Sequence, residues 1–368
     1  MNIAIISPAI YPHCDGGVEF FNYHLMQELA AQGHKIWVFT WFEYDWKNEN
    51  ITNVKLSRRS LLFVVPTMIF HTLLALKKLK HQIDVIHVPY TSNSQFAFPI
   101  YLAYKNYKIP YVIFIHGGGM YTWTRKKIQQ LFFQSADTII AVSENIKTEY
   151  EKRSKKKIIV MPNLIPFKHS QENKIELLQK YNLKNNIIIL YLGAIKKIKG
   201  IDNLINAFMN LGLEYVENKK VKLIICGNGP LKKSLDERVD LMGFKEYIKF
   251  LGYINEKQKL EYLKMSDIYV IPSHFEAQSI SLFEAMYNGL AIIGSDTKGI
   301  NNIITDGDNG LLFPVDNQDA LKNKLMLLID NENLRLDFSR KSENYYNKHF
   351  NYDEWLKKLI QIYASSLK

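Results

Sequence analysis

Two glutamates, Glu276 and Glu284, enclose seven residues and form the most informative polar pattern in the chain. Glu276 is expected in a loop after a buried strand at residues 268–271, and Glu284 in the first turn of the next helix. A helix N-terminus offers free N–H groups and a partial positive charge, so it can hold a diphosphate. A carboxylate there would repel phosphate, but it could accept hydrogen bonds from the hydroxyls of a sugar or a ribose.

The same residues have a purely structural interpretation. Ser281 and Glu284 have the spacing of a capping box, which needs no ligand. Glu276 could equally be an acidic residue of a surface loop. Taken alone, the pattern leaves both interpretations open.

The elements around these residues point to an α/β fold. Residues 2–7 form an apolar run typical of a strand buried on both faces of a parallel sheet. A loop with Gly16-Gly17 follows, then apolar residues at helical spacing that end near Gly33, then a strand at 35–40. Further strands are expected at 85–88, 111–115, 138–142, 157–161, 186–192, 222–226, 248–251, 268–271 and 291–294.

Strands that alternate with helices predict parallel, doubly wound sheets. A chain of 368 residues suits two such domains, joined near residues 162–175. Ligands of open α/β sheets bind beyond the carboxyl ends of the strands. Because the glycine-rich loops follow strands, those of the two halves could face one another across a cleft.

Cysteine content, apolar segments and charge indicate in which cell compartment the protein works and which partners it could bind. Only two cysteines occur, Cys14 and Cys226, which favours a reducing compartment. No signal peptide is recognisable at the start, and the apolar run at 61–70 is too short to span a bilayer, so a cytoplasmic location is expected. Residues 1–165 hold 19 basic against 11 acidic side chains. This excess suits an anionic partner such as a membrane surface, although a solvated basic surface explains it equally well.

Several motifs, taken in order, resemble the retaining, two-Rossmann-domain glycosyltransferases of family 4 (GT-B type, group 1), and the resemblance runs nearly end to end. The matching segments are Gly16-Gly17-Val18-Glu19, 136–144, 160–163, Gly193 to Asp202, Gly227-Asn228-Gly229-Pro230, Phe250-Leu251-Gly252, Glu276 to Glu284 and 306–312. The resemblance implies an acceptor-binding domain at 1–165, a nucleotide-sugar-binding domain at 166–350, and a last helix at 351–368 that packs on the first domain.

The resemblance also implies roles for individual residues. Lys199 of the second domain would contact the donor diphosphate. Gly17 would let the backbone of the first domain approach the same diphosphate. Glu284 would hold the ribose hydroxyls. Glu276 would hold donor sugar hydroxyls near the reacting carbon, and His116 would lie beside the transferred sugar, so these two are the catalytic candidates.

Two departures from the family pattern affect the donor site. The family commonly has arginine where this chain has Ala194, and Lys196 or Lys197 could supply the missing charge; Lys197 is taken as the candidate. The family motif usually reads Glu-Gly-Phe-Gly, whereas residues 276–279 read Glu-Ala-Gln-Ser. Side chains replace glycines there, so the identity of the donor sugar is left open.

Other chemistry has little support. No dinucleotide fingerprint, P-loop or metal-ligand spacing is present, so we expect no cofactor and no metal. The expected partners are a nucleotide-sugar donor, a glycan or lipid-linked acceptor and an anionic membrane surface, without nucleic acid. Residues 66–80 predict either a core helix with a basic end or an interfacial helix on lipid. The alternatives are a nucleotide-sugar epimerase of similar fold and a basic nucleic-acid-binding protein.

Overall fold

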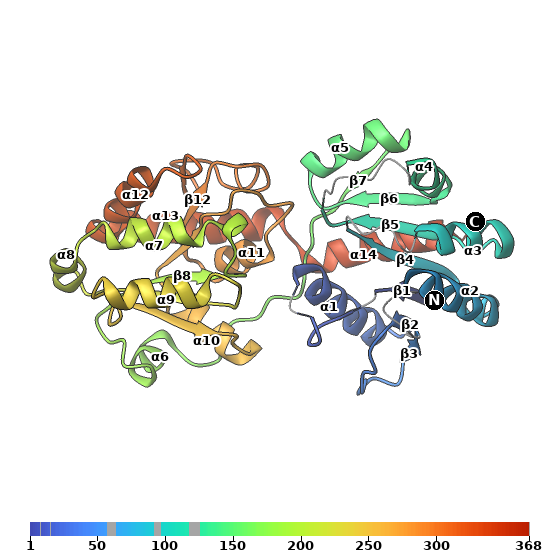
Figure 1. Ribbon diagram of the computed structural model, residues 1–368, viewed down its shortest axis with the longest axis horizontal. Helices are drawn as coiled ribbons and strands as arrows, with labels where there is room; N and C mark the ends of the chain where they lie inside the picture. The colour runs from blue at the N-terminus through green and yellow to red at the C-terminus, as the bar shows by residue number, and fades with distance from the viewer. Residues whose placement is uncertain (8, 15, 57–63, 92–96, 118–125, 368) are drawn as a thin grey trace. The chain divides into compact units, whose positions relative to one another are not determined.

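The computed structural model describes all residues except 8, 15, 57–63, 92–96, 118–125 and 368. The chain divides into two compact units (Figure 1). The first unit comprises Met1–Pro166 and Tyr352–Lys368, and the second comprises Phe167–Asn351. Each unit contains one parallel sheet with helices around it, which confirms the expected α/β fold with two Rossmann-like domains.

The sheet of the first unit has the strand order β3-β2-β1-β4-β5-β6-β7, and the paired strands are parallel. The strands are β1 Asn2–Ile6, β2 Lys35–Thr40, β3 Ile51–Lys55, β4 Val85–Tyr90, β5 Tyr111–Ile115, β6 Thr138–Ala141 and β7 Ile159–Val160. The sequence did not predict β3, because only Ile51 of this edge strand is buried and its other side chains carry little apolar signal.

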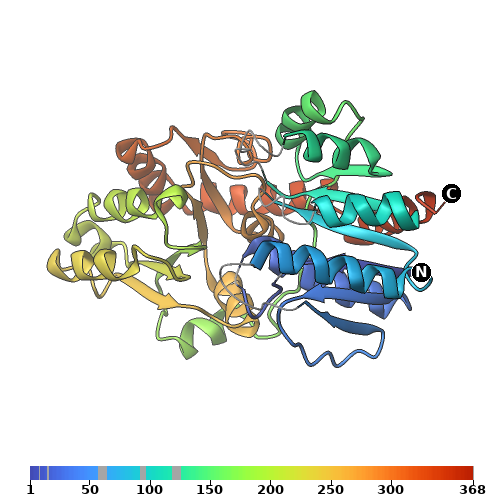
Figure 2. The same cartoon turned by 45° about the vertical axis from the view of Figure 1, so that its right-hand side comes forward.

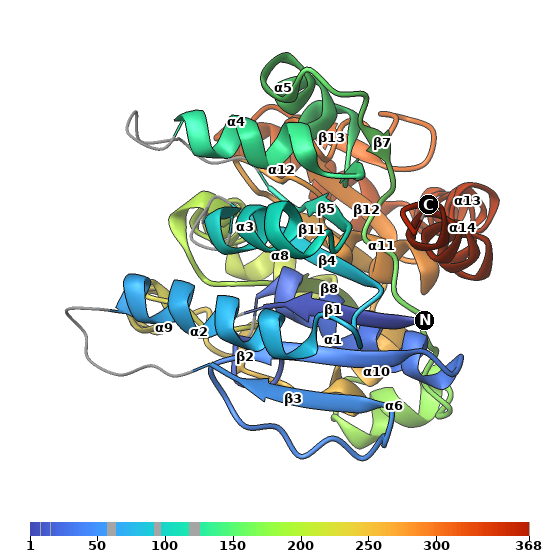
Figure 3. The same cartoon turned by 90° about the vertical axis from the view of Figure 1, so that its right-hand side faces the viewer.

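Helices cover both faces of this sheet (Figure 3). They are α1 Gly17–Ala31, α2 Val64–Leu79, α3 Ala97–Tyr107, α4 Lys126–Ser135, α5 Glu144–Ser154 and α14 Tyr352–Ser365. Successive strand residues point to opposite faces. In β5, Tyr111 stacks on Phe132 of α4, whereas Phe114 contacts Phe21 of α1. Helices α2 and α3 run side by side on the same face of the sheet as α4 (Figure 2, blue and cyan).

The last helix, α14, packs against the first unit, as expected from the sequence. The Tyr363 hydroxyl lies 2.7 Å from Nδ1 of His87 on β4, and both side chains are fully buried. Near the start of the same helix, the ring of Trp355 contacts the rings of Phe21 and Phe114. The helix therefore completes the core on the α1 face of the sheet.

The second unit has the strand order β10-β9-β8-β11-β12-β13. Its strands are β8 Ile187–Leu192, β9 Val221–Cys226, β10 Ile248–Gly252, β11 Ile268–Ile271, β12 Ala291–Ser295 and β13 Leu311–Phe313. Its helices are α6 Lys174–Lys180, α7 Ile201–Met209, α8 Leu213–Asn218, α9 Lys232–Leu241, α10 Glu256–Met265, α11 Ile280–Tyr287, α12 Gln318–Asp330 and α13 Glu332–His349, with the 3₁₀ turn η4 at Lys197–Lys199. The strand order reverses between β8 and β11, and a crevice for ligands is expected where such a reversal occurs.

Candidate active site

The loops after β8 and β11 bring the central candidate residues together. Lys199 lies at the end of η4, in the connection from β8 to α7, and Glu276 lies in the loop between β11 and α11. Since β8 and β11 are neighbours in a parallel sheet, both loops leave the same edge. The candidate site therefore occupies the carboxyl edge of the second sheet at its reversal point.

An ion pair joins the two loops. Nζ of Lys199 lies 2.6 Å from Oε1 of Glu276, and the Ser273 hydroxyl donates a 2.8 Å hydrogen bond to the same oxygen. The Glu276 side chain is only 9% exposed, whereas that of Lys199 is 30% exposed. A charge-assisted hydrogen bond in such a setting is short and strong. In the part of the chain that the structure describes, Oε2 of Glu276 accepts no hydrogen bond, so this oxygen can accept one from a ligand hydroxyl.

Two glycines allow the backbone to close around the Glu276 loop. Gly200 has φ +62°, and a Cβ there would lie 1.9 Å from the carbonyl oxygen of Pro272. Gly299 has φ +90°, and a Cβ there would lie 2.0 Å from the carbonyl oxygen of Glu276. Only glycine fits such contacts at positive φ without strain. The β11–α11 loop is thus held from both sides by close backbone approach.

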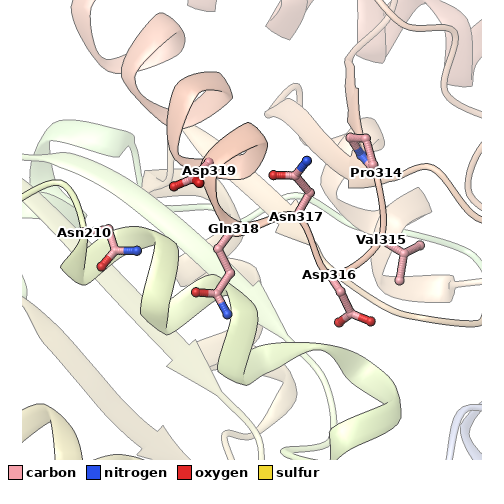
Figure 4. A pocket seen from close by; sticks show the side chains of 7 residues that line it. All are labelled: Asn210, Pro314, Val315, Asp316, Asn317, Gln318 and Asp319. Carbon is pink, nitrogen blue, oxygen red and sulfur yellow. The ribbon is translucent and has the colours of Figure 1, made fainter.

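A polar cluster extends from this loop toward α7 and α12. The His274 backbone N–H donates to the Ile198 carbonyl at 2.9 Å, which ties η4 to the Glu276 loop. The His274 ring nitrogen Nε2 lies 2.9 Å from Oδ1 of Asp316, and Asn203 donates to the same oxygen at 2.6 Å. Asp316 also lines a shallow, open pocket between the end of α7 and residues 314–319 (Figure 4).

Glu284 lies in a different local environment from the one predicted. Helix α11 begins at Ile280, and its N-cap is Ser279, whose hydroxyl accepts from the Leu282 N–H at 3.2 Å. The prediction of a first-turn glutamate is therefore wrong, since Glu284 is the fifth residue of the helix. The capping-box interpretation with Ser281 is wrong for the same reason. The sequence offers two serines two positions apart, and the chain uses the earlier one as the cap.

Glu284 instead pairs with a lysine that sequence reasoning missed. Nζ of Lys259, on α10, lies 2.5 Å from Oε1 of Glu284 and 2.9 Å from Oε1 of Glu256. The side chains of Lys259 and Glu284 are 14% and 8% exposed. Burial raises the pKa of Glu284, and Lys259 partly opposes that shift. The pKa of Lys259 is raised as well, because the two carboxylates outweigh its loss of solvation.

The glycine loops after β8 and β9 also approach closely. A Cβ on Gly227 would lie 1.9 Å from the Gly193 carbonyl oxygen, and one on Gly229 would lie 2.2 Å from that of Ile195. Between these loops and α7, Lys196 and Lys197 are both exposed to solvent. The candidate Lys197 thus belongs to the same 3₁₀ turn as Lys199 but contacts neither Glu276 nor Glu284 among the described residues.

The other two candidates belong to the first unit. His116 follows β5, is 5% exposed, and contacts the ring of Phe21 from α1. Burial lowers the pKa of His116 to about 3, with Asn163 partly opposing the shift, so the imidazole is neutral near neutral pH. A neutral imidazole can donate one hydrogen bond and accept another. Gly17 is the first residue of α1, and a Cβ added there would meet no atom within 4 Å.

Nothing in the described structure indicates a metal centre or a membrane span. Within the described ranges, no group of three or more His, Cys, Asp or Glu side chains is placed to hold a metal ion. The helices that the structure describes also include none long and apolar enough to cross a bilayer.

Comparison with known proteins gives the family. Residues 15–168 match Glycosyltransferase Family 4, and residues 173–345 match Glycosyl transferases group 1. These two matches account for most of both units, and they coincide with the two parallel sheets. The chain therefore belongs to the group 1 glycosyltransferases of GT-B fold, which makes it an enzyme that transfers sugars.

Relatives of known sequence and structure agree with this assignment. The uncharacterized glycosyltransferase MJ1178 of Methanocaldococcus jannaschii is 26% identical over 371 residues, covering 98% of this chain and 97% of its own. The alpha-monoglucosyldiacylglycerol synthase of Acholeplasma laidlawii is 28% identical over 345 residues, 85% of each chain. HepE of Anabaena, solved with UDP-glucose, superposes with a TM-score of 0.81 at 17% identity, covering 99% of this chain and 100% of HepE, and so supports the fold.

Proposed function

We propose that this chain is a retaining hexosyltransferase that moves a sugar from a nucleotide-diphosphate donor to a glycan or lipid-linked acceptor, in the synthesis of a cell-surface polysaccharide or glycoconjugate. The observation that carries the proposal is the Lys199–Glu276 pair at the carboxyl edge of the second sheet. It places a cation suited to a diphosphate beside a carboxylate suited to sugar hydroxyls.

In this proposal the second unit binds the donor. Lys199 and Lys197 contact the diphosphate, Glu276 accepts hydrogen bonds from the sugar hydroxyls, and Glu284 accepts those of the ribose. The bond from the anomeric carbon to the diphosphate breaks, and the acceptor oxygen bonds the same carbon while its proton is released. Catalysis then consists of positioning and of stabilising the charge on the departing diphosphate. Lysines supply that positive charge, so no metal ion is required.

The first unit binds the acceptor in this proposal. Gly17, by contrast, serves the donor: it starts α1 with open space beside its Cα, which suits the close approach of the donor diphosphate. His116, neutral and buried, offers a hydrogen bond to the transferred sugar. The names of relatives such as alpha-monoglucosyldiacylglycerol synthase motivate the lipid-linked class of acceptor.

We also propose that the enzyme works in the cytoplasm, on the inner face of a membrane. Helix α2 carries Phe70 and Leu74, which are 59% and 39% exposed, on the unit with the larger basic excess. The helix buries Leu76 but leaves Lys77 and Lys78 in solvent, so its outer side is both apolar and basic. That combination is typical of helices that lie on anionic lipid. The sequence predicts membrane association through residues 58–80, and residues 58–63 of that range lie outside the described residues.

A thermal-shift panel of nucleoside diphosphates and their sugar conjugates tests the donor class. A ligand at about 100 times its Kd adds about 2.7 kcal/mol of stability, which raises Tm measurably. A shift with one nucleotide sugar is the expected result, and no shift with any of them contradicts the proposal. Conversion of that donor only when acceptor is added then distinguishes a transferase from an epimerase, which alters the donor alone.

A further inference from the structure

One buried lysine links α10 to α11. Lys259 lies between two carboxylates, 2.5 Å from Glu284 and 2.9 Å from Glu256. Of these, Glu256 is 45% exposed at the surface, whereas the Glu284 side chain is 8% exposed. The lysine thus reaches from a solvent-facing carboxylate to an almost fully buried one.

A carboxylate as buried as Glu284 is stable as an anion only beside a positive charge. Transfer of an ionised carboxyl out of water is expensive, so such a group normally takes up a proton instead. The titratable groups that act on Glu284 besides Lys259 are Glu256 of α10, Tyr269 of β11 and Tyr346 of α13. None of these three is a cation, so Lys259 is the positive charge that acts on Glu284 within the described residues.

We propose that Lys259 is a positioning residue for the donor: it fixes one oxygen of Glu284 and keeps that carboxylate ionised so that it can accept hydrogen bonds from ribose hydroxyls. This inference rests on the proposed function. A protonated Glu284 would present a hydroxyl donor and a neutral acceptor, and hydrogen bonds to a charged acceptor are roughly twice as strong as those between neutral groups. Discrimination between ribose and deoxyribose therefore depends on a residue that contacts neither sugar.

The test compares Lys259→Met with Lys257→Met by calorimetry. Lys257 lies on the same helix, is 77% exposed, and lies 3.9 Å from Glu172 and 3.8 Å from Glu261, so its replacement removes the same charge without touching Glu284. The ligands are UDP and GDP, each beside its 2′-deoxy form. We expect Lys259→Met to weaken binding of the preferred ribonucleotide about tenfold. The 2′-deoxynucleotide should show a clearly smaller loss, because it offers Glu284 one hydroxyl instead of two. Lys257→Met should resemble wild type, and Lys259→Arg should restore most of the affinity.

The pH dependence supplies a second readout that a purely structural lysine would not change. Glu284 binds ribose when ionised, so affinity falls as pH drops through its pKa. Removing Lys259 raises that pKa further, so the loss in Lys259→Met must begin at higher pH and diminish in alkaline buffer. Equal losses for ribo- and deoxynucleotides with an unshifted pH profile overturn the inference. If wild type binds neither UDP nor GDP nor any nucleotide sugar, the proposed function itself fails.

Discussion

Lys199 can serve either Glu276 or a diphosphate, and its replacement separates binding from folding. We expect Lys199→Ala to weaken donor binding by one to two orders of magnitude, since a hydrogen bond to a charged group contributes about 1.5–3 kcal/mol. The fold should stay intact with a modest fall in Tm, because Glu276 is 9% exposed and loses its cation but keeps its hydrogen bond from Ser273. Lys219→Ala is the matched control: Lys219 pairs with Asp330 at 2.6 Å on the surface of the same unit. Equal donor affinity of the two variants in calorimetry would refute the assignment.

Glu284→Gln tests the second glutamate without disturbing a cap, because Ser279 caps α11. Burial raises the pKa of Glu284, so the folded state binds this proton more tightly than the unfolded state. As pH rises from the pKa of Glu284 in the unfolded chain to its higher pKa in the folded state, ionisation of Glu284 lowers the free energy of unfolding. Glutamine does not ionise and avoids this cost. Glutamine also removes one of the two carboxylates beside the buried Lys259, which opposes this gain. We therefore expect a Tm that changes little near neutral pH, together with a loss of turnover of about tenfold or more. Wild-type turnover in a donor-consumption assay contradicts the prediction.

At the scale of elements, the approach of η4 to the β11–α11 loop depends on Gly200. Alanine there incurs positive-φ strain and also a backbone clash with Pro272. Gly212→Ala is the matched control, since its φ is +88° but no atom lies within 4 Å of the added Cβ. We expect Gly212→Ala to cost about 1 kcal/mol, and Gly200→Ala to cost clearly more and to lose donor affinity as well. Chemical denaturation measures both, and equal costs would show that the close approach carries no strain.

The exposed apolar side of α2 leads to a prediction about membranes. We expect Phe70→Ser with Leu74→Ser to reduce co-flotation with anionic liposomes several-fold, because each side chain contributes apolar area to the interface. Leu241→Ser with Met242→Ser is the control: these residues are 88% and 56% exposed, but at the end of α9 in the second unit. Absence of flotation by the wild type at low salt, or equal loss in both double variants, contradicts the membrane proposal.

Element boundaries show what the sequence could predict. Strands such as β8 were predictable because their apolar residues are continuous, and parallel strands buried on both faces require that pattern. Strand β3 was not, because one buried residue in an edge strand leaves no periodic signal. The start of α11 depended on a choice between Ser279 and Ser281 that tertiary packing decides. The Lys259–Glu284 pair joins two helices across the fold, and no local spacing announces such a contact.

For the whole molecule, the two units differ in their response to acid. The first unit contains His87 and His116, and burial lowers the pKa of each from 6.5 to about 3. The unfolded chain therefore takes up these protons first as pH falls below 6.5, so this unit loses stability in acid. The loss is about 1.4 kcal/mol per histidine for each pH unit. In the second unit, the raised pKa of Glu284 has the opposite effect. The folded state takes up this proton more readily than the unfolded chain, so this group adds stability as pH falls.

We therefore expect calorimetry at decreasing pH to show the first unit unfolding earlier than the second. Tyr363→Phe should lower the same transition further, because it removes the hydroxyl that pairs with Nδ1 of buried His87, and an unsatisfied buried group costs about 1–3 kcal/mol. Replacing His116 with asparagine should make the acid sensitivity shallower. A single transition that is independent of both histidines contradicts this account.

The Lys199–Glu276 pair also bears on how the enzyme completes a cycle. On the proposed function, an intact donor draws Lys199 to its diphosphate and compensates Glu276 with sugar hydroxyls. After transfer, the sugar has left with the acceptor. The remaining nucleoside diphosphate then competes for Lys199 with the Glu276 carboxylate, which is only 9% exposed and no longer accepts hydrogen bonds from the sugar hydroxyls. Re-forming the ion pair then favours departure of the spent nucleotide. The proposed function thus gives Lys199 two parts in the cycle, binding of the donor and release of the product.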